Sequence, residues 1–155
     1  MPATPDSPRA GLTTIRRRRT YPHPPAAVWA ALTQPDLLTA WFMRTDDFVP
    51  SPGTTFTLID DQARGWSGRV RGTVLDARPP SRLVYRWQAD DDPDVTTVTW
   101  TLTLTQDGGT DLTLVHAGFR RHPRSLLTRA FLDLGWRSML RTTLADAITR
   151  AAARA

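Results

Sequence analysis

Two side chains in the sequence, His116 and Tyr85, could transfer protons. His116 follows Leu112 and Leu114 on the apolar face of a predicted strand, and it is the one ionisable group that we place on that face. A histidine titrates near neutral pH, so it could act as an acid or a base, or hydrogen-bond a ligand carbonyl. The alternative, which we favour, is a buried histidine whose hydrogen bonds are satisfied by the backbone or by Tyr85.

No other catalytic or metal-binding pattern stands out. The 155 residues contain no cysteine and only three scattered histidines, so we predict no metal site and no resident cofactor. Ser67 and Ser138 lie in no nucleophile-elbow pattern, and no carboxylate can be placed beside His116. The acidic run Asp90–Asp94 is shorter than a calcium loop and lacks its terminal glutamate, so we interpret it as a solvated turn.

The basic residues, all 20 of them arginine, form two local clusters, Arg16–Arg19 and the segment from Arg120 to Arg124. In a strand the first cluster must alternate between faces, so Arg17 or Arg19 could reach a ligand carboxylate. We favour a solvated edge strand whose charges discourage aggregation. A net charge of +5, with no glycine-rich phosphate loop and no RNA-binding motif, predicts no nucleic-acid partner.

Periodicity predicts the elements that would position these residues. Residues 13–21 are expected to form a strand, and short helices should begin at Pro25 and Pro35. From about residue 46 to 118 the apolar residues alternate, which indicates an antiparallel sheet with one covered face. The cover should be a single long helix over about 126–153, with Gly135 as a bend or a close packing point. Residues 1–12 are interpreted as a flexible tail and 13–155 as one domain.

Bulky rings dominate the face of the sheet that this helix should cover. Such rings leave irregular gaps where a curved sheet wraps a helix, so they could line a ligand cavity or could fill the core. Gly68 and Gly72 on the same face would permit curvature or leave space. The predicted ligand-binding set is Trp41, Phe42, Phe56, Trp66, Val70, Tyr85, Trp87, Trp100, His116, Phe119, Trp136, Met139 and Leu140.

Four segments carry a resemblance to a known superfamily: PPAAVWAALTQPDLLTAWF, GRVRGTVLDARPPSRLVYRW, TDLTLVHAGF and LGWRSMLRTTL. In their order and spacing they resemble the START-like, or SRPBCC, superfamily. The likeness is strongest to the family of the heat-shock-protein-90 ATPase activator C-terminal domain, in its bacterial single-domain form. The resemblance implies an α+β helix-grip fold: a curved antiparallel sheet around a long C-terminal helix, with two short helices after the first strand.

Within this fold the predicted function is binding of a small apolar or amphipathic molecule between sheet and helix. One alternative is an enzyme of the cyclase or dehydratase type that uses His116 and Tyr85. A second is a co-chaperone-like module with a protein partner, acting in a stress response. No apolar run is long enough for membrane insertion, and the apolar stretch after Arg16–Arg19 is too short for an export signal, so we expect a cytoplasmic protein, either monomer or homodimer.

Overall fold

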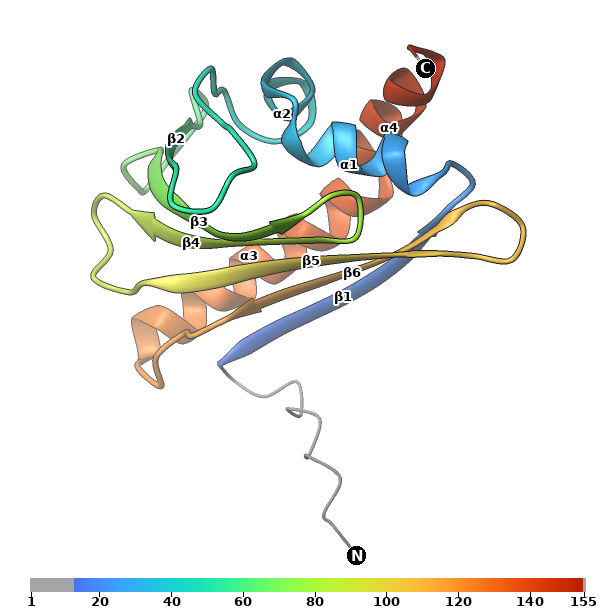
Figure 1. Cartoon of the computed structure of the whole chain (residues 1–155). Helices are drawn as coiled ribbons and strands as arrows, with labels where there is room; N and C mark the ends of the chain where they lie inside the picture. The colour runs from blue at the N-terminus through green and yellow to red at the C-terminus, as the bar shows by residue number, and fades with distance from the viewer. Residues whose placement is uncertain (1–12, 155) are drawn as a thin grey trace, which may run out of the picture.

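The computed structural model describes residues 13–154, in which a curved sheet lies against helices (Figure 1). The predicted tail, residues 1–12, lies outside the described residues. Neighbouring strands are all antiparallel, in the order β1-β6-β5-β4-β3-β2. The strands are β1 (Thr14–Tyr21), β2 (Thr55–Ile59), β3 (Arg69–Arg78), β4 (Arg82–Ala89), β5 (Thr96–Leu104) and β6 (Thr110–Ala117).

The alternation of apolar and polar residues explains the sheet. In β5, Val98, Trp100 and Leu102 are buried, whereas Thr99 and Thr101 between them face away from the core. The same alternation continues in β6, where His116 pairs with Val98 of β5 on one side and with Ile15 of β1 on the other. The predicted sheet with one covered face is therefore confirmed.

One predicted strand is shorter than expected. The strand that should include Trp66 and Gly68 begins only at Arg69, the first residue of β3. Gly68 has a φ of +73°, a left-handed conformation that is incompatible with an extended strand. Trp66 and Gly68 therefore belong to a loop, residues 60–68, between β2 and β3. Gly72 stays in β3, where the Phe56 ring lies against it, so it leaves no open space.

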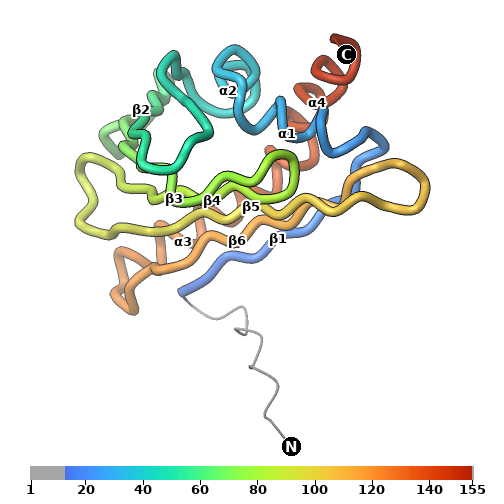
Figure 2. Tube along the Cα trace, viewed as in Figure 1, coloured from blue at the N-terminus to red at the C-terminus, as the bar shows by residue number. Residues whose placement is uncertain are grey.

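Two short helices follow β1, as predicted. Helix α1 (Pro25–Thr33) and helix α2 (Pro35–Trp41) both begin at a proline, whose missing N–H is not needed in the first turn. Both pack against helix α4 (Thr143–Ala153), and the three helices gather at one end of the sheet (Figure 2).

The expected long C-terminal helix is confirmed, but it begins at Pro123 rather than at about residue 126 and is divided into two helices at Thr142. Helix α3 spans Pro123–Arg141, begins three residues early with His122 as its N-cap, and ends at Thr142, where φ is −119° and ψ is −81°. Gly135 lies inside α3, so it is not the break, and it is not a close packing point either, because a Cβ there would have no neighbour within 4 Å. The Thr143 hydroxyl donates to the Trp41 carbonyl at 3.0 Å, which ties the start of α4 to the end of α2.

Helix α3 crosses the covered face of the sheet, whereas α4 packs beside α1 and α2 (Figure 1). Because of the break at Thr142, one C-terminal segment covers the sheet with α3 and packs against α1 and α2 with α4. Among residues 13–154, no helix is long and apolar enough to span a bilayer.

Candidate functional site

The middle of the space between α3 and the sheet is filled by aromatic rings. Trp136 of α3 is fully buried, and its ring centroid lies 5.1 Å from Phe42, 5.5 Å from Trp100 and 6.1 Å from Trp87. Trp41 stacks on Phe42 at 4.8 Å. Here the expected gap between helix and sheet is absent, since the rings contact one another as in an ordinary core.

His116 lies inside this core with both ring nitrogens hydrogen-bonded. The indole N–H of Trp136 donates to Nδ1 at 3.1 Å, and Nε2 lies 2.7 Å from the Thr96 hydroxyl. An indole N–H can only donate, so Nδ1 accepts and the ring proton sits on Nε2. Burial lowers the pKa of His116 to about 3, so the ring is neutral. It is a satisfied buried histidine, but its partners are Trp136 and Thr96, not the expected backbone or Tyr85.

Tyr85 is held in a separate hydrogen bond. Its hydroxyl accepts from the indole N–H of Trp100 at 3.0 Å, and its ring packs against Phe48 and Phe56. Burial raises the pKa of Tyr85 well above its usual range. Neither Tyr85 nor His116 is therefore poised to exchange a proton with the other, and no acid–base pair forms from these two residues.

An open pocket of about 590 Å³ lies beside the first half of α3 and reaches Met43, just after the end of α2. Its walls are the first half of α3, the loop 60–68, and the strand ends on either side of the β4–β5 turn. Seven apolar side chains supply most of the wall, namely Met43, Trp66, Trp87, Phe119, Leu127, Phe131 and Leu132. The rest of the lining is Arg64, Gly65, Ala89, Asp91, Asp92, Asp94, Thr96, Arg124 and Thr128.

Three residues of the predicted ligand-binding set line this pocket: Trp66, Trp87 and Phe119. The others lie elsewhere, in the filled core or beneath β2 and β3: Trp41, Phe42, Phe56, Val70, Tyr85, Trp100, His116, Trp136, Met139 and Leu140. The predicted ligand-binding set contains none of the residues with which α3 lines the pocket. The signal for this part of the wall was the pair Leu127 and Phe131, which are four residues apart and so lie on one side of a helix.

The polar side of the pocket is built on Asp94. The predicted solvated turn is wrong for this residue, because Asp94 is 7% exposed. Its carboxylate accepts a hydrogen bond from the Ser125 hydroxyl and pairs with Arg120 Nε at 2.7 Å. Part of the second arginine cluster thus joins the β4–β5 turn to the start of α3, and Arg124 also donates to the Asp91 carbonyl at 3.3 Å.

The first half of α3 is held by polar contacts. Arg17 Nε pairs with Asp133 Oδ1 at 2.8 Å, and Arg129 Nη2 donates to the Thr14 carbonyl at 2.9 Å. Apart from Ser125, the buried residues of α3 begin at Trp136. Before Trp136, Leu132 packs against the core while only partly buried, so this half-helix is held to the sheet less closely than the second half, which leaves room for the pocket. Neither Arg17 nor Arg19 lines it.

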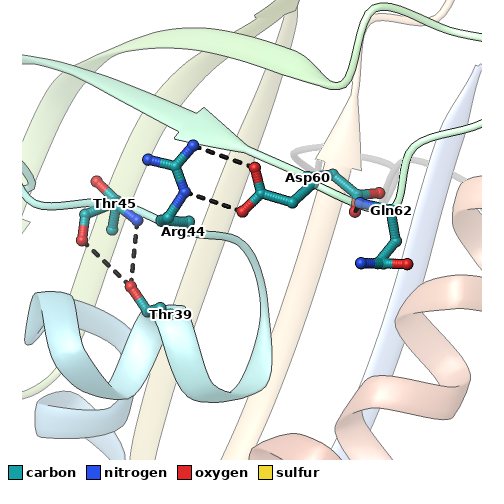
Figure 3. Close-up of polar contacts among 6 residues, drawn as sticks. Thr39, Arg44, Thr45, Asp60 and Gln62 are labelled. Carbon is teal, nitrogen blue, oxygen red and sulfur yellow. Dashed lines mark hydrogen bonds and ion pairs between the residues drawn. The ribbon is translucent and has the colours of Figure 1, made fainter.

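Hydrogen bonds also fix the loop on the opposite wall. Arg44 donates to the Asp61 carboxylate through Nε at 2.9 Å and Nη2 at 3.1 Å. Nearby, Thr39 and Thr45 hydrogen-bond to each other (Figure 3). At the far end of the loop, the Ser67 N–H donates to the Asp91 carboxylate at 3.0 Å. Trp66 is thus carried by a loop that is anchored at both ends.

The comparisons with known proteins agree with this fold. Residues 22–149 match the family model described as Activator of Hsp90 ATPase homolog 1-like protein, and no curated protein matches the chain. The chain is similar to protein MLL2253 from Mesorhizobium loti, with 33% identity over 88% of this chain and 97% of that one, at a TM-score of 0.75.

Two further solved structures are similar. CalU16 from Micromonospora echinospora has 26% identity over 91% of this chain and 82% of its own, at a TM-score of 0.66. PFC0360w, an HSP90 activator from Plasmodium falciparum, has 21% identity over 76% of this chain and 84% of its own, at a TM-score of 0.61, which is a likeness of fold alone.

Proposed function

The chain belongs to the family of Activator of Hsp90 ATPase homolog 1-like proteins, and we propose that it binds a small apolar or amphipathic molecule in the pocket beside the first half of α3. The observation that carries this proposal is the pocket itself. About 590 Å³ falls within the range of small-molecule sites, and the wall is mainly aromatic and aliphatic with charged groups along one side.

The driving force would be burial of apolar surface. A ligand that buries about 200 Å² of apolar surface gains about 5 kcal/mol before the costs of association. The carboxylates of Asp91 and Asp92 and the guanidinium of Arg124 would then orient a polar end of the ligand. Met43, Trp66 and Leu132, which are partly buried, could repack against the apolar end.

The cyclase-type alternative loses its proposed acid–base pair. His116 and Tyr85 are each committed to a tryptophan, and neither lines the pocket. A neutral histidine with both nitrogens bonded has no free lone pair to accept a proton from a substrate. Binding without an assigned reaction is therefore the function that the site supports best.

Native mass spectrometry of the freshly purified protein, followed by titration with the neutral probe N-phenyl-1-naphthylamine, tests the proposal. Thr128→Trp puts a large ring into the pocket wall and should weaken probe binding at least tenfold. Ala130→Trp, on the same helix but not lining the pocket, is the matched control and should leave binding within twofold. If the wild type retains no ligand and the probe fluorescence does not rise, the proposal is rejected.

A further inference from the structure

Helix α3 carries a row of exposed apolar side chains on its outward face. Leu127, Phe131 and Leu134 are 60%, 68% and 63% exposed. Their spacing of four and three residues places them on one side of the helix, along about 10 Å of its length. Large apolar side chains that gather in this way mark an interaction surface more often than scattered ones do.

The exposed charges that α3 itself carries along this row are positive, whereas Asp91, Asp92 and Asp94 lie on the pocket side of Leu127 and Phe131. Arg124, Arg137 and Arg141 are exposed on α3. The acidic residue of this helix, Asp133, is paired with Arg17 of β1 and so faces the sheet. Within residues 13–154, Arg137 and Arg141 take part in no ion pair. At the positions of Arg137 and Arg141, the outward face of α3 therefore combines apolar side chains with positive charge that no described carboxylate pairs.

We propose that this face docks onto an anionic lipid surface, with Leu127, Phe131 and Leu134 entering the interface and the arginines contacting the headgroups. A helix that carries Leu and Phe flanked by arginine has the composition of an interfacial helix. Each arginine near such a surface strengthens binding about fivefold. A second copy is a poorer occupant, because two identical faces would oppose arginine to arginine.

The position of the pocket favours a lipid surface over a protein partner. Leu127 and Phe131 belong both to the exposed row and to the pocket wall. Docking would therefore bring the apolar layer of the bilayer next to the pocket mouth, and an apolar ligand could pass between them without crossing water. This last step rests on the proposed ligand-binding function, whereas the docking itself does not.

Sedimentation with vesicles tests the docking. The wild type should bind vesicles of phosphatidylcholine and phosphatidylglycerol at 3:1 at least tenfold more strongly than pure phosphatidylcholine vesicles, and 0.5 M salt should weaken this binding. The double variant Phe131→Ser/Leu134→Ser should bind the anionic vesicles at least tenfold more weakly than the wild type. Its control, Leu104→Ser, removes an equally exposed leucine at the end of β5 and should stay within twofold.

A second pair of variants tests how much the arginines of α3 contribute to vesicle binding. Arg137→Gln/Arg141→Gln should weaken binding to the anionic vesicles about tenfold or more and abolish the preference over neutral ones. Arg16→Gln/Arg86→Gln removes two exposed arginines of the sheet that form no ion pair among the described residues, and should change binding less than threefold. Circular dichroism and thermal melting establish that every variant is folded.

Three results would overturn the docking proposal. The first is that the wild type does not bind anionic vesicles, and the second is that the row variants and their controls lose vesicle binding equally. The third is self-association of the wild type that Phe131→Ser/Leu134→Ser abolishes, which would make the row a contact between copies. Binding of N-phenyl-1-naphthylamine without vesicles is measured in parallel. If that binding persists while vesicle binding fails, the docking proposal falls and the pocket proposal stands.

Discussion

Trp136 donates its indole N–H to Nδ1 of His116, and this contact joins helix α3 to strand β6 at the centre of the core. It fixes the histidine proton on Nε2, where the Thr96 hydroxyl of β5 is 2.7 Å away. That hydroxyl in turn lies 3.4 Å from the Trp87 carbonyl of β4. One helix and three strands are thus connected through a single buried ring.

Replacing His116 should therefore destabilise the fold. His116→Phe replaces the imidazole by a somewhat larger apolar ring and leaves the Trp136 N–H buried without an acceptor, at an expected cost of about 1–3 kcal/mol in the free energy of unfolding. Urea unfolding followed by tryptophan fluorescence measures it. In a double-mutant cycle, Trp136→Phe should cost less in the His116→Phe background than in the wild type. Additive effects of the two changes would argue against the contact.

The same ring predicts a pH dependence of stability. The pKa of His116 is about 3 in the folded chain and about 6.5 in the unfolded one, so between these values the unfolded state binds more protons. The free energy of unfolding therefore has its full value, as far as His116 is concerned, above pH 6.5. Below that pH it decreases as the pH falls, by at most about 1.4 kcal/mol per pH unit.

Chemical unfolding at pH 7.0, 6.0, 5.0 and 4.5 checks this prediction. The window stays above the ordinary carboxyl pKa values, so the aspartates contribute little to the slope. In His116→Phe the slope should be flatter than in the wild type by about 1 kcal/mol per pH unit. Equal slopes in the two proteins would show that His116 titrates normally in the fold.

The sequence predicts the sheet well because each strand alternates by itself. In β5, for example, the alternation of Thr99, Trp100 and Thr101 indicates which side chains face the core, and no other element is needed to predict it. The break at Thr142 depends instead on where α1 and α2 stand relative to the sheet, which no local pattern encodes. Residues 136–151 carry a continuous apolar stripe, so periodicity alone predicts one helix there.

In the candidate site, too, some features follow from local sequence and others depend on how distant elements pack. Burial of His116 follows from its place in β6, but its partners depend on which side chain α3 brings opposite it. The pocket depends on the first half of α3 standing away from the sheet, and that distance is set by contacts such as Arg17–Asp133 between residues 116 positions apart. Volume is a property of packing between elements, and for this reason most of the predicted lining lies in filled core.

The polar attachment of α3 predicts uneven protection along this helix. Residues 126–135 should exchange their amide hydrogens faster than residues 136–141, because the latter contain the buried Trp136 and Leu140. Asp94→Asn weakens the contacts to Ser125 and Arg120 and should speed exchange in 119–131 further, with 136–141 unchanged. Hydrogen exchange read by mass spectrometry checks this. Uniform protection along α3 would mean that its first half is held as firmly as its second.

Substitution of glycine by alanine should have opposite effects on stability at two positions, Gly72 and Gly135. At Gly72 a Cβ would clash with the Phe56 ring and come within 2.5 Å of the Arg86 carbonyl oxygen, so Gly72→Ala should destabilise by about 2–3 kcal/mol through overpacking. At Gly135, in the middle of α3, a Cβ meets nothing within 4 Å, so Gly135→Ala should stabilise by about 0.5–1 kcal/mol through helix propensity. Thermal and urea unfolding of both variants measure the two signs. A loss of stability in Gly135→Ala would mean that another element packs against α3 where the structure leaves open space.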